Sequence, residues 1–192
     1  HNMHGIMALF AATGAFLSFF HQGSLGGVWR VIYSTPFGFR TGLLVWPWTF
    51  FLYTWSAAAC GPCFTLFITR ITEMATCKKL VKDNVVELLA KIAGWMLLTY
   101  IVAKIIDTVY WAAVTAPAMG FTLMDFYSNN PGSAYGLWIL IAEIGVCGVL
   151  PAVMLVAPGI RSNPRLRFIA VSLASLGACL NRWVMVLQTQ AV

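Results

Sequence analysis

Residues 88–114 read LLAKIAGWMLLTYIVAKIIDTVYWAAV, a stretch dominated by aliphatic and aromatic side chains. A helix that crosses the hydrocarbon core of a bilayer needs about 20 predominantly apolar residues, so this stretch is long enough to span it. Apolar stretches of similar character lie on both sides of it, at about 3–20, 43–74, 137–157 and 168–187. The sequence therefore predicts an all-α fold, a polytopic transmembrane helix bundle with about five spanning helices.

The composition of the chain agrees with a membrane location. Of its 192 residues, 60% are hydrophobic and 9% are charged. A soluble domain carries about 25% charged residues, so a soluble fold of this composition would lack a polar surface. We expect a single transmembrane bundle over residues 1–192, with no second domain. The net charge of +6 comes from basic residues in short loops and indicates topology, not nucleic-acid binding.

The basic residues are distributed unevenly between the predicted loops. Most of them lie between the second and third apolar stretches and between the fourth and fifth: Arg70, Lys78, Lys79, Lys82, Arg161, Arg165 and Arg167. Cytoplasmic loops are enriched in lysine and arginine, so both of these loops are predicted to be cytoplasmic. The opposite end of the bundle, including residues 21–26, should then face the periplasm or exterior, with the chain in a bacterial or archaeal cytoplasmic membrane.

The hexapeptide HQGSLG, residues 21–26, ends the first apolar stretch. It places an imidazole and an amide where hydrocarbon meets water, followed by small residues that allow a flat ligand to approach the backbone. A quinone headgroup needs apolar walls, a hydrogen-bond donor for each carbonyl and a route for protons, and histidine titrates near neutral pH. We predict that His21, Gln22 and Ser24 contact a quinone. The alternative is that His21 only caps its helix and binds water.

Four ionisable residues lie inside the apolar stretches, where charge is costly: Lys104, Asp107, Glu143 and Arg182. One interpretation is a polar seam between helices that relays protons, because a carboxylate in a low-dielectric site beside a cation can exchange its proton. The other is structural, with Glu143 neutralised by Arg182 and Asp107 by Lys104, which is three residues away on the same helix face. The two interpretations can coexist.

Other redox chemistry is not expected from this chain. Residues 60–63 read CGPC, but a thioredoxin-type motif needs an accessible thiolate at a helix N-terminus, and this one lies inside an apolar stretch. All the histidines, His1, His4 and His21, belong to the first stretch or its end, so a haem held between histidines of two helices is not expected. No cluster of ligands with metal-site spacing is present, so we expect neither haem nor metal in this chain.

Four stretches carry a resemblance to a known family: residues 11–27 (AATGAFLSFFHQGSLGG), 104–107 (KIID), 138–143 (WILIAE) and 176–183 (LGACLNRW). In order and spacing they resemble the NrfD-like family, also called the polysulfide reductase membrane-subunit family. It includes membrane subunits of periplasm-facing hydrogenases, of alternative complex III and of respiratory complexes in sulfate reducers. The resemblance covers the C-terminal half of the family, so we expect the chain to be the C-terminal part of a longer subunit. Gly23 stands where the family usually has a first serine.

The resemblance implies a function. It implies two four-helix bundles without haem, menaquinone or another quinone bound near the periplasmic face, and electron exchange with a periplasm-side iron–sulfur subunit of ferredoxin type. A multihaem cytochrome c and other membrane subunits are further implied partners. His21 and Gln22 would border the quinone, and the proton path would use Lys104, Asp107, Glu143 and Arg182.

Three other functions stay open on the sequence. The chain could be a membrane anchor without a redox role. It could be a small transporter or channel that uses the charged seam, although we find no inverted repeat of the kind such proteins have. It could also be a quinone-linked thiol oxidase that uses Cys60 and Cys63.

Overall fold

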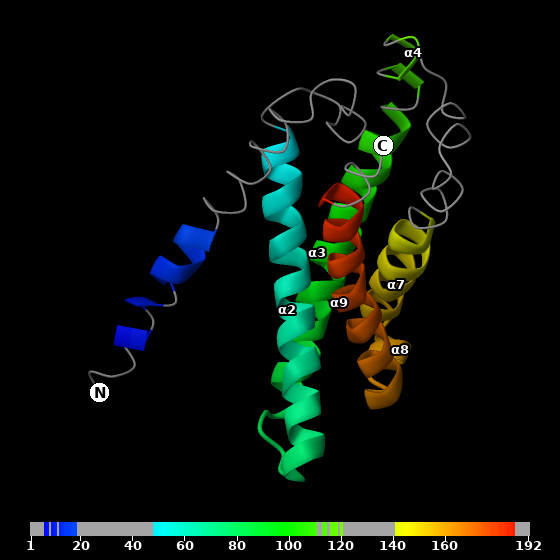
Figure 1. Cartoon of the computed structure of the whole chain (residues 1–192). Coiled ribbons are helices and arrows are strands. Elements are labelled where there is room, and N and C mark those ends of the chain that lie inside the picture. Colours follow the sequence, from blue (N-terminus) through cyan, green and yellow to red (C-terminus); the bar gives the residue numbers. More distant parts are fainter. Residues whose placement is uncertain are drawn as a thin grey trace.

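The computed structural model describes residues 6–7, 9–10, 12–18, 48–110, 113–114, 116–118, 120 and 141–186. The main elements are α2 (Trp48–Thr76), α3 (Asp83–Tyr110), η3 (Ala142–Val149), α7 (Leu150–Val156), α8 (Pro158–Arg161) and α9 (Pro164–Val186), with a short α4 (Ala116–Ala118) after α3. The longer helices form a bundle in which η3 continues directly into α7 (Figure 1). Every element in the described part of the chain is helical, so the predicted all-α class is confirmed.

Four of the predicted apolar stretches coincide with helices. The second, third and fifth correspond to α2, α3 and α9, and the fourth corresponds to the continuous pair of η3 and α7. Of the first stretch, residues 12–18 are helical with exposed side chains, and Figure 1 draws them apart from the bundle. Within the described residues, α3 is long and apolar enough to cross a bilayer, and the apolar Ala142–Val156 is shorter. Five spans remain a prediction.

The connection between α2 and α3 is held by a carboxylate. Cys77 adopts a left-handed backbone conformation (φ 52°) directly after the last residue of α2. The Glu73 side chain then accepts hydrogen bonds from the backbone N–H groups of Leu80 (3.0 Å) and Val81 (3.4 Å). These bonds fix the turn that reverses the chain, so that α3 packs beside α2.

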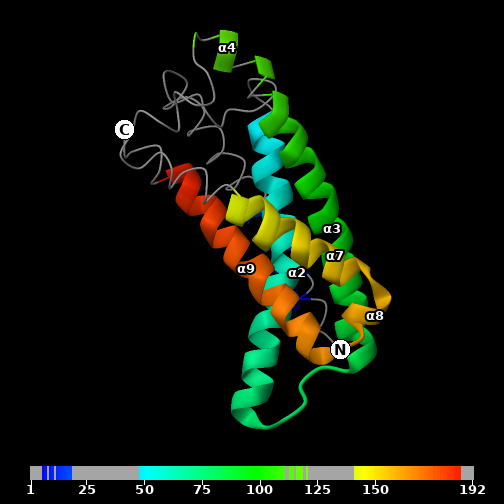
Figure 2. The same ribbon diagram turned by 90° about the vertical axis from the view of Figure 1, so that its right-hand side faces the viewer.

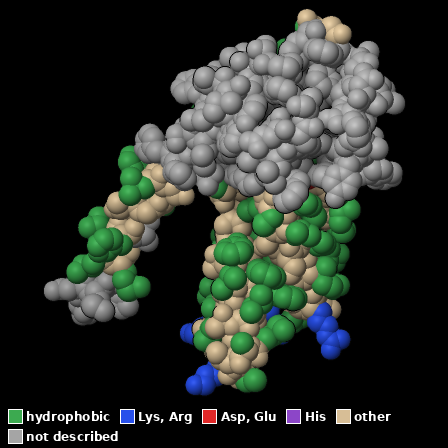
Figure 3. Space-filling model, viewed as in Figure 1, with side chains coloured by type: hydrophobic (Ala, Val, Ile, Leu, Met, Phe, Trp, Pro, Cys, Tyr) green, Lys and Arg blue, Asp and Glu red, His purple; other side chains and the backbone are tan. Residues whose placement is uncertain are grey.

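Both basic loops lie at the same end of the bundle. Figure 2 shows the α2–α3 connection and α8 at one end, and Figure 3 shows lysine and arginine side chains gathered there. Arg161 of α8 lies 3.8 Å from the Glu87 carboxylate at the beginning of α3, which joins the two loops. This arrangement agrees with the predicted topology, in which these loops share one side of the membrane.

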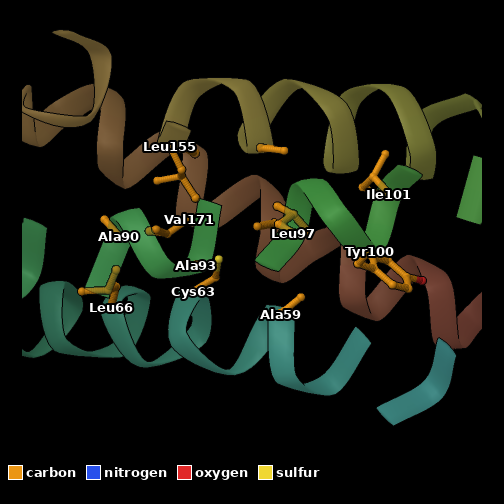
Figure 4. Close-up of a cluster of buried hydrophobic side chains, with 13 residues drawn as sticks. Ala59, Cys63, Leu66, Ala90, Ala93, Leu97, Tyr100, Ile101, Leu155 and Val171 are labelled. Carbon is orange, nitrogen blue, oxygen red and sulfur yellow. The ribbon is translucent and has the colours of Figure 1, made fainter. Parts of the chain in front are cut away.

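The interior of the bundle is built from small residues. Cys63 of α2 lies beside Ala93 of α3, Ala59 and Ala90 belong to the same cluster, and all four are completely buried (Figure 4). A Cβ added at Gly94 would lie 2.8 Å from the Cβ of Leu155, so α3 and α7 can approach only because this residue is glycine. Small residues that bring backbones together are typical of helix packing in membranes.

The exterior of the bundle carries the large apolar side chains. The exposed ones lie on α2, α3, α7 and α9, and they include Phe64, Leu88, Ile106, Val153 and Leu176. Figure 3 shows apolar side chains spread over the face of the bundle in view. So many exposed large apolar side chains are unusual for a soluble monomer and suit a lipid environment.

Candidate functional site

A buried ion pair joins α3 to η3. The Nζ of Lys104 contacts the Oε1 of Glu143, and the two side chains are 7% and 4% exposed. The same Nζ lies 5.9 Å from the centre of the Tyr100 ring, a cation–π contact. Removing two charges from water costs several kcal/mol per ion unless they are paired with good geometry, so each charge depends on the other.

The position of Glu143 follows from the wide helix that carries it. Residues Ala142–Val149 form a π-helix, and Pro151 follows within the first turn of α7. Proline has no N–H to donate to the preceding turn, and π-helical turns are frequent at functional sites. The spacing of a π-helix brings Glu143, Cys147 and Gly148 to one side, and all three are buried. The acidic side chain is thereby directed into the bundle.

Glu143 also borders an internal cavity. The cavity has a volume of about 160 Å³ and is lined by residues of α2, α3, η3 and α9. Its polar lining comes from Ser56, Cys60, Tyr100 and Glu143, and the remaining walls are apolar. This is room for several water molecules beside polar partners. Glu143 thus contacts Lys104 and also lines a small cavity whose walls are mostly apolar.

The other predicted ionisable residues lie at the same end of the bundle. Asp107 follows Lys104 on the same face of α3 and is 9% exposed. Arg182 lies in the last turns of α9, and its side chain is outside the described residues. Figure 1 shows the end of α3, the beginning of η3 and the end of α9 together, opposite the basic loops. The four residues are therefore placed at the end predicted to be periplasmic.

The structure gives Glu143 a partner that the sequence did not predict. The sequence paired Glu143 with Arg182 and Asp107 with Lys104; the structure shows an ion pair between Lys104 and Glu143, and the partner of Asp107 stays a prediction. The pairing of Arg182 stays a prediction because its side chain is not described. His21, Gln22 and Ser24 also lie outside the described residues, so their predicted contacts with a quinone stay predictions.

One buried charge was missed by sequence reasoning. Arg161, interpreted only as part of a basic loop, is 7% exposed and donates from Nη1 to the carbonyl oxygens of Leu155 (3.0 Å) and Val156 (3.1 Å). It therefore satisfies the last carbonyls of α7, where a cation is favoured by the helix dipole. A basic residue just beyond a Pro-Gly helix end is the signal that could have revealed it.

The CGPC motif lies inside α2, as the sequence predicts. Cys63 is completely buried against α3 and Cys60 is partly buried, and the two are not joined by a disulfide. The surrounding helix is continuous through Pro62. A buried thiol in the middle of a helix is a packing residue and lacks the access that disulfide exchange requires. In the part of the chain that the structure describes, no group of His, Cys, Asp and Glu residues could hold a metal ion.

One relative of known function matches the chain along its whole length. The integral membrane subunit of menaquinone reductase from Nitratidesulfovibrio vulgaris (strain Hildenborough) is 45% identical to it over all 192 residues. These residues make up 45% of that protein, so the chain spans less than half of the relative that it matches. No protein-family model matches the chain, and no solved structure does.

Proposed function

We propose that this chain is part of an integral membrane subunit of a menaquinone-linked respiratory complex in a bacterial cytoplasmic membrane. The observation that carries the proposal is the buried Lys104–Glu143 pair, whose glutamate lines a cavity, in a chain with 45% identity to a menaquinone reductase membrane subunit. Ionisable groups inside a bundle with an apolar exterior are expensive and mark proton or ligand pathways. A purely packing role would not need a carboxylate that borders a cavity.

The finer parts of the proposal come from the resemblance to the NrfD-like family. The chain would form the C-terminal, polytopic bundle of a longer subunit, and its partners would be a periplasm-side iron–sulfur subunit of ferredoxin type, a multihaem cytochrome c and other membrane subunits. His21 would donate a hydrogen bond to one quinone carbonyl, and Gln22 and Ser24 would contact the same headgroup. A quinone supplies two-electron chemistry coupled to uptake of protons, so its protein site needs proton donors.

The described residues suit such a supply of protons. Glu143 would hold a proton on the carboxylate that borders the cavity, and Lys104 would keep this carboxylate ionised between transfers. Protonation of Glu143 would break the ion pair and leave the charge of Lys104 beside Asp107, which is close on the same helix face. Asp107 and Arg182 would thus complete the relay at the end of the bundle where residues 21–26 are expected.

The proposal is tested by comparing two glutamates in the full-length protein within its complex. Glu143→Gln removes the buried carboxylate, and Glu87→Gln makes the same change at a position where the side chain is 48% exposed. We expect quinone-coupled turnover and proton uptake to fall at least tenfold in E143Q, in the range of lost general acid–base catalysis, and to stay near wild type in E87Q. Normal turnover and proton uptake in a folded E143Q would leave the pair a structural one and favour an anchor subunit.

A further inference from the structure

A second, larger cavity lies at the basic end of the bundle. It has a volume of about 390 Å³ and lies between the last turns of α2, the loop after it and the beginning of α9. Its rim carries Arg70, Lys78, Lys79 and Arg167, and its inner wall is apolar, with Phe168 and Val171 of α9 on one side. The cavity is therefore cationic toward the loops and apolar toward the interior of the bundle.

The rim keeps positive charge after its own carboxylates are counted. Arg70 contacts Glu73 at 3.4 Å, and Lys79 forms an ion pair with Asp83. Within the described residues, neither Lys78 nor Arg167 makes an ion pair, and the Nη1 of Arg167 donates to the carbonyl oxygen of Arg161 at 3.3 Å. Two cationic side chains that line the cavity are thus available to an anion, and Arg167 also acts electrostatically on Asp83 of the same lining.

The carboxylate of Glu73 does not cancel this charge. It accepts hydrogen bonds from the backbone N–H groups of Leu80 and Val81 and also contacts Arg70. The hydrogen bond from Leu80 is the main reason that the pKa of Glu73 is lowered. Glu73 is therefore committed to holding the loop that carries Lys78. Lys78 and Arg167 both line the cavity.

The apolar wall is ordered by helix contacts. The rings of Phe67 on α2 and Phe168 on α9 stack with centroids 5.8 Å apart and planes 7° from parallel. The stack holds the two helices together below the rim, so an apolar chain in the cavity would lie along Phe168 and Val171. A free anion would contact only the cationic rim, and a neutral apolar ligand would contact only the apolar wall. A ligand with an anionic head and an apolar chain would contact both.

We propose that this cavity binds the phosphodiester headgroup of an anionic phospholipid, with the phosphate between Lys78 and Arg167 and an acyl chain along Phe168 and Val171. Basic pockets between helices on the cytoplasmic side of a membrane attract anionic headgroups, and the planar guanidinium of arginine suits phosphate. The proposal rests on the membrane location proposed above, and on no part of the redox function.

The test measures lipid binding, not turnover. The full-length protein is purified in mild detergent, delipidated, and offered phosphatidylglycerol or phosphatidylcholine while bound lipid is counted by native mass spectrometry. K78Q/R167Q is compared with K82Q/R165Q, which removes the same charge from exposed side chains outside the cavity. Relative to wild type, we expect phosphatidylglycerol to bind K78Q/R167Q at least about tenfold more weakly and to bind K82Q/R165Q with nearly unchanged affinity. Equal weakening in both variants would overturn the site.

Two further arms keep the result decisive. Lys78→Glu changes an exposed side chain that the fold tolerates, and it should weaken phosphatidylglycerol binding without lowering the thermal midpoint. Inorganic phosphate and glycerol 3-phosphate test the source of the anion. If they bind as tightly as the lipid and depend equally on Lys78 and Arg167, the site is one for soluble phosphates and the lipid proposal is wrong.

Discussion

Lys104 of α3 and Glu143 of η3 are 39 residues apart in sequence and form an ion pair between the two helices. Both side chains are nearly inaccessible to solvent. Lys104 contacts the Tyr100 ring, and Tyr100 and Glu143 both line the same cavity. Each residue neutralises the charge of the other, which is a structural role. Glu143 also lines a cavity large enough for water, which suits a role in proton transfer. The two roles can be separated by comparing stability and proton uptake when one partner is replaced and when both are replaced.

Removing a single partner should destabilise the bundle more than removing both. Lys104→Met leaves a buried carboxylate without its cation and is expected to cost about 3–5 kcal/mol of unfolding free energy. K104M/E143L replaces the pair with apolar side chains and should recover most of that loss, while proton uptake stays low. The measurement is a double-mutant cycle of unfolding in mixed micelles. Additive effects of the two single changes would show that the residues do not interact.

Close approach of α3 and α7 depends on a single glycine. A Cβ at Gly94 would lie 2.8 Å from the Cβ of Leu155 and 2.9 Å from its carbonyl carbon, so Gly94→Ala should force the helices apart and cost about 1–3 kcal/mol. Gly61 of α2 is the matched control, because a Cβ there meets nothing within 4 Å. Gly61→Ala should leave the thermal midpoint in detergent unchanged or slightly raised. A similar response of both variants would contradict the packing of α3 against α7.

The sequence predicted the helices well because their signal is local. Uninterrupted apolar runs force the backbone to satisfy its hydrogen bonds within the run, so length and hydropathy place a helix without knowledge of its neighbours. The predicted second stretch ends at about residue 74, and α2 ends at Thr76. The π-helical turns of η3 were not predicted, because a wide turn depends on how Pro151 is accommodated among neighbouring helices.

The partner of Glu143 could not be derived from sequence. Which cation meets a carboxylate in a bundle depends on the rotation of each helix about its axis, and the apolar runs here have little amphipathic pattern to reveal that rotation. Lys104 and Glu143 meet because the buried face of α3 carries Leu97, Ile101 and Lys104 in succession toward η3. The candidate role of Lys104 was predicted from its intramembrane charge, but its contact was not.

The turn after α2 should be sensitive to acid. Helix α2 has 29 residues, more than the roughly 20 that a hydrocarbon core of about 30 Å needs, and Glu73 lies near its last turn and bonds to the basic loop, so we expect this carboxylate to lie outside the core. The pKa of Glu73 is lowered from its ordinary value of 4.5, chiefly by the N–H of Leu80. A lowered folded-state pKa contributes stability above pH 4.5 that is lost as the pH falls toward the folded-state value.

Glu73→Gln should therefore reduce the dependence of loop stability on pH in the acid range. Wild-type protein is expected to lose protection of the loop at residues 77–82 as the pH falls below 4.5, whereas E73Q should show weak protection at every pH. Hydrogen exchange of the Leu80 and Val81 amides measures this. An unchanged pH profile in E73Q would mean that the carboxylate does not hold the turn.

The histidine at the end of the first apolar stretch should matter for quinone chemistry, while the one at its beginning should not. His21→Ala is expected to lower quinone-coupled turnover of the intact complex at least tenfold, because a hydrogen-bond donor and proton carrier is lost. His4→Ala makes the same chemical change near the other end of the stretch and should leave turnover unchanged. Displacement of a bound quinone-site inhibitor gives the second measurement. Equal activity of both variants would remove His21 from the proposed site.

The predicted topology can be tested with the native cysteines. Cys77 is exposed in the basic loop after α2, and Cys63 is completely buried in the same helix. If that loop is cytoplasmic, a membrane-impermeant maleimide should label Cys77 in inside-out vesicles and not in right-side-out vesicles or spheroplasts. Cys63 should resist the reagent in both until the protein is unfolded, and Cys77→Ser should abolish the loop signal. Labelling of Cys77 from the periplasmic side would invert the bundle, placing Lys104 and Glu143 at the cytoplasmic end, and would separate them from a periplasm-side electron partner.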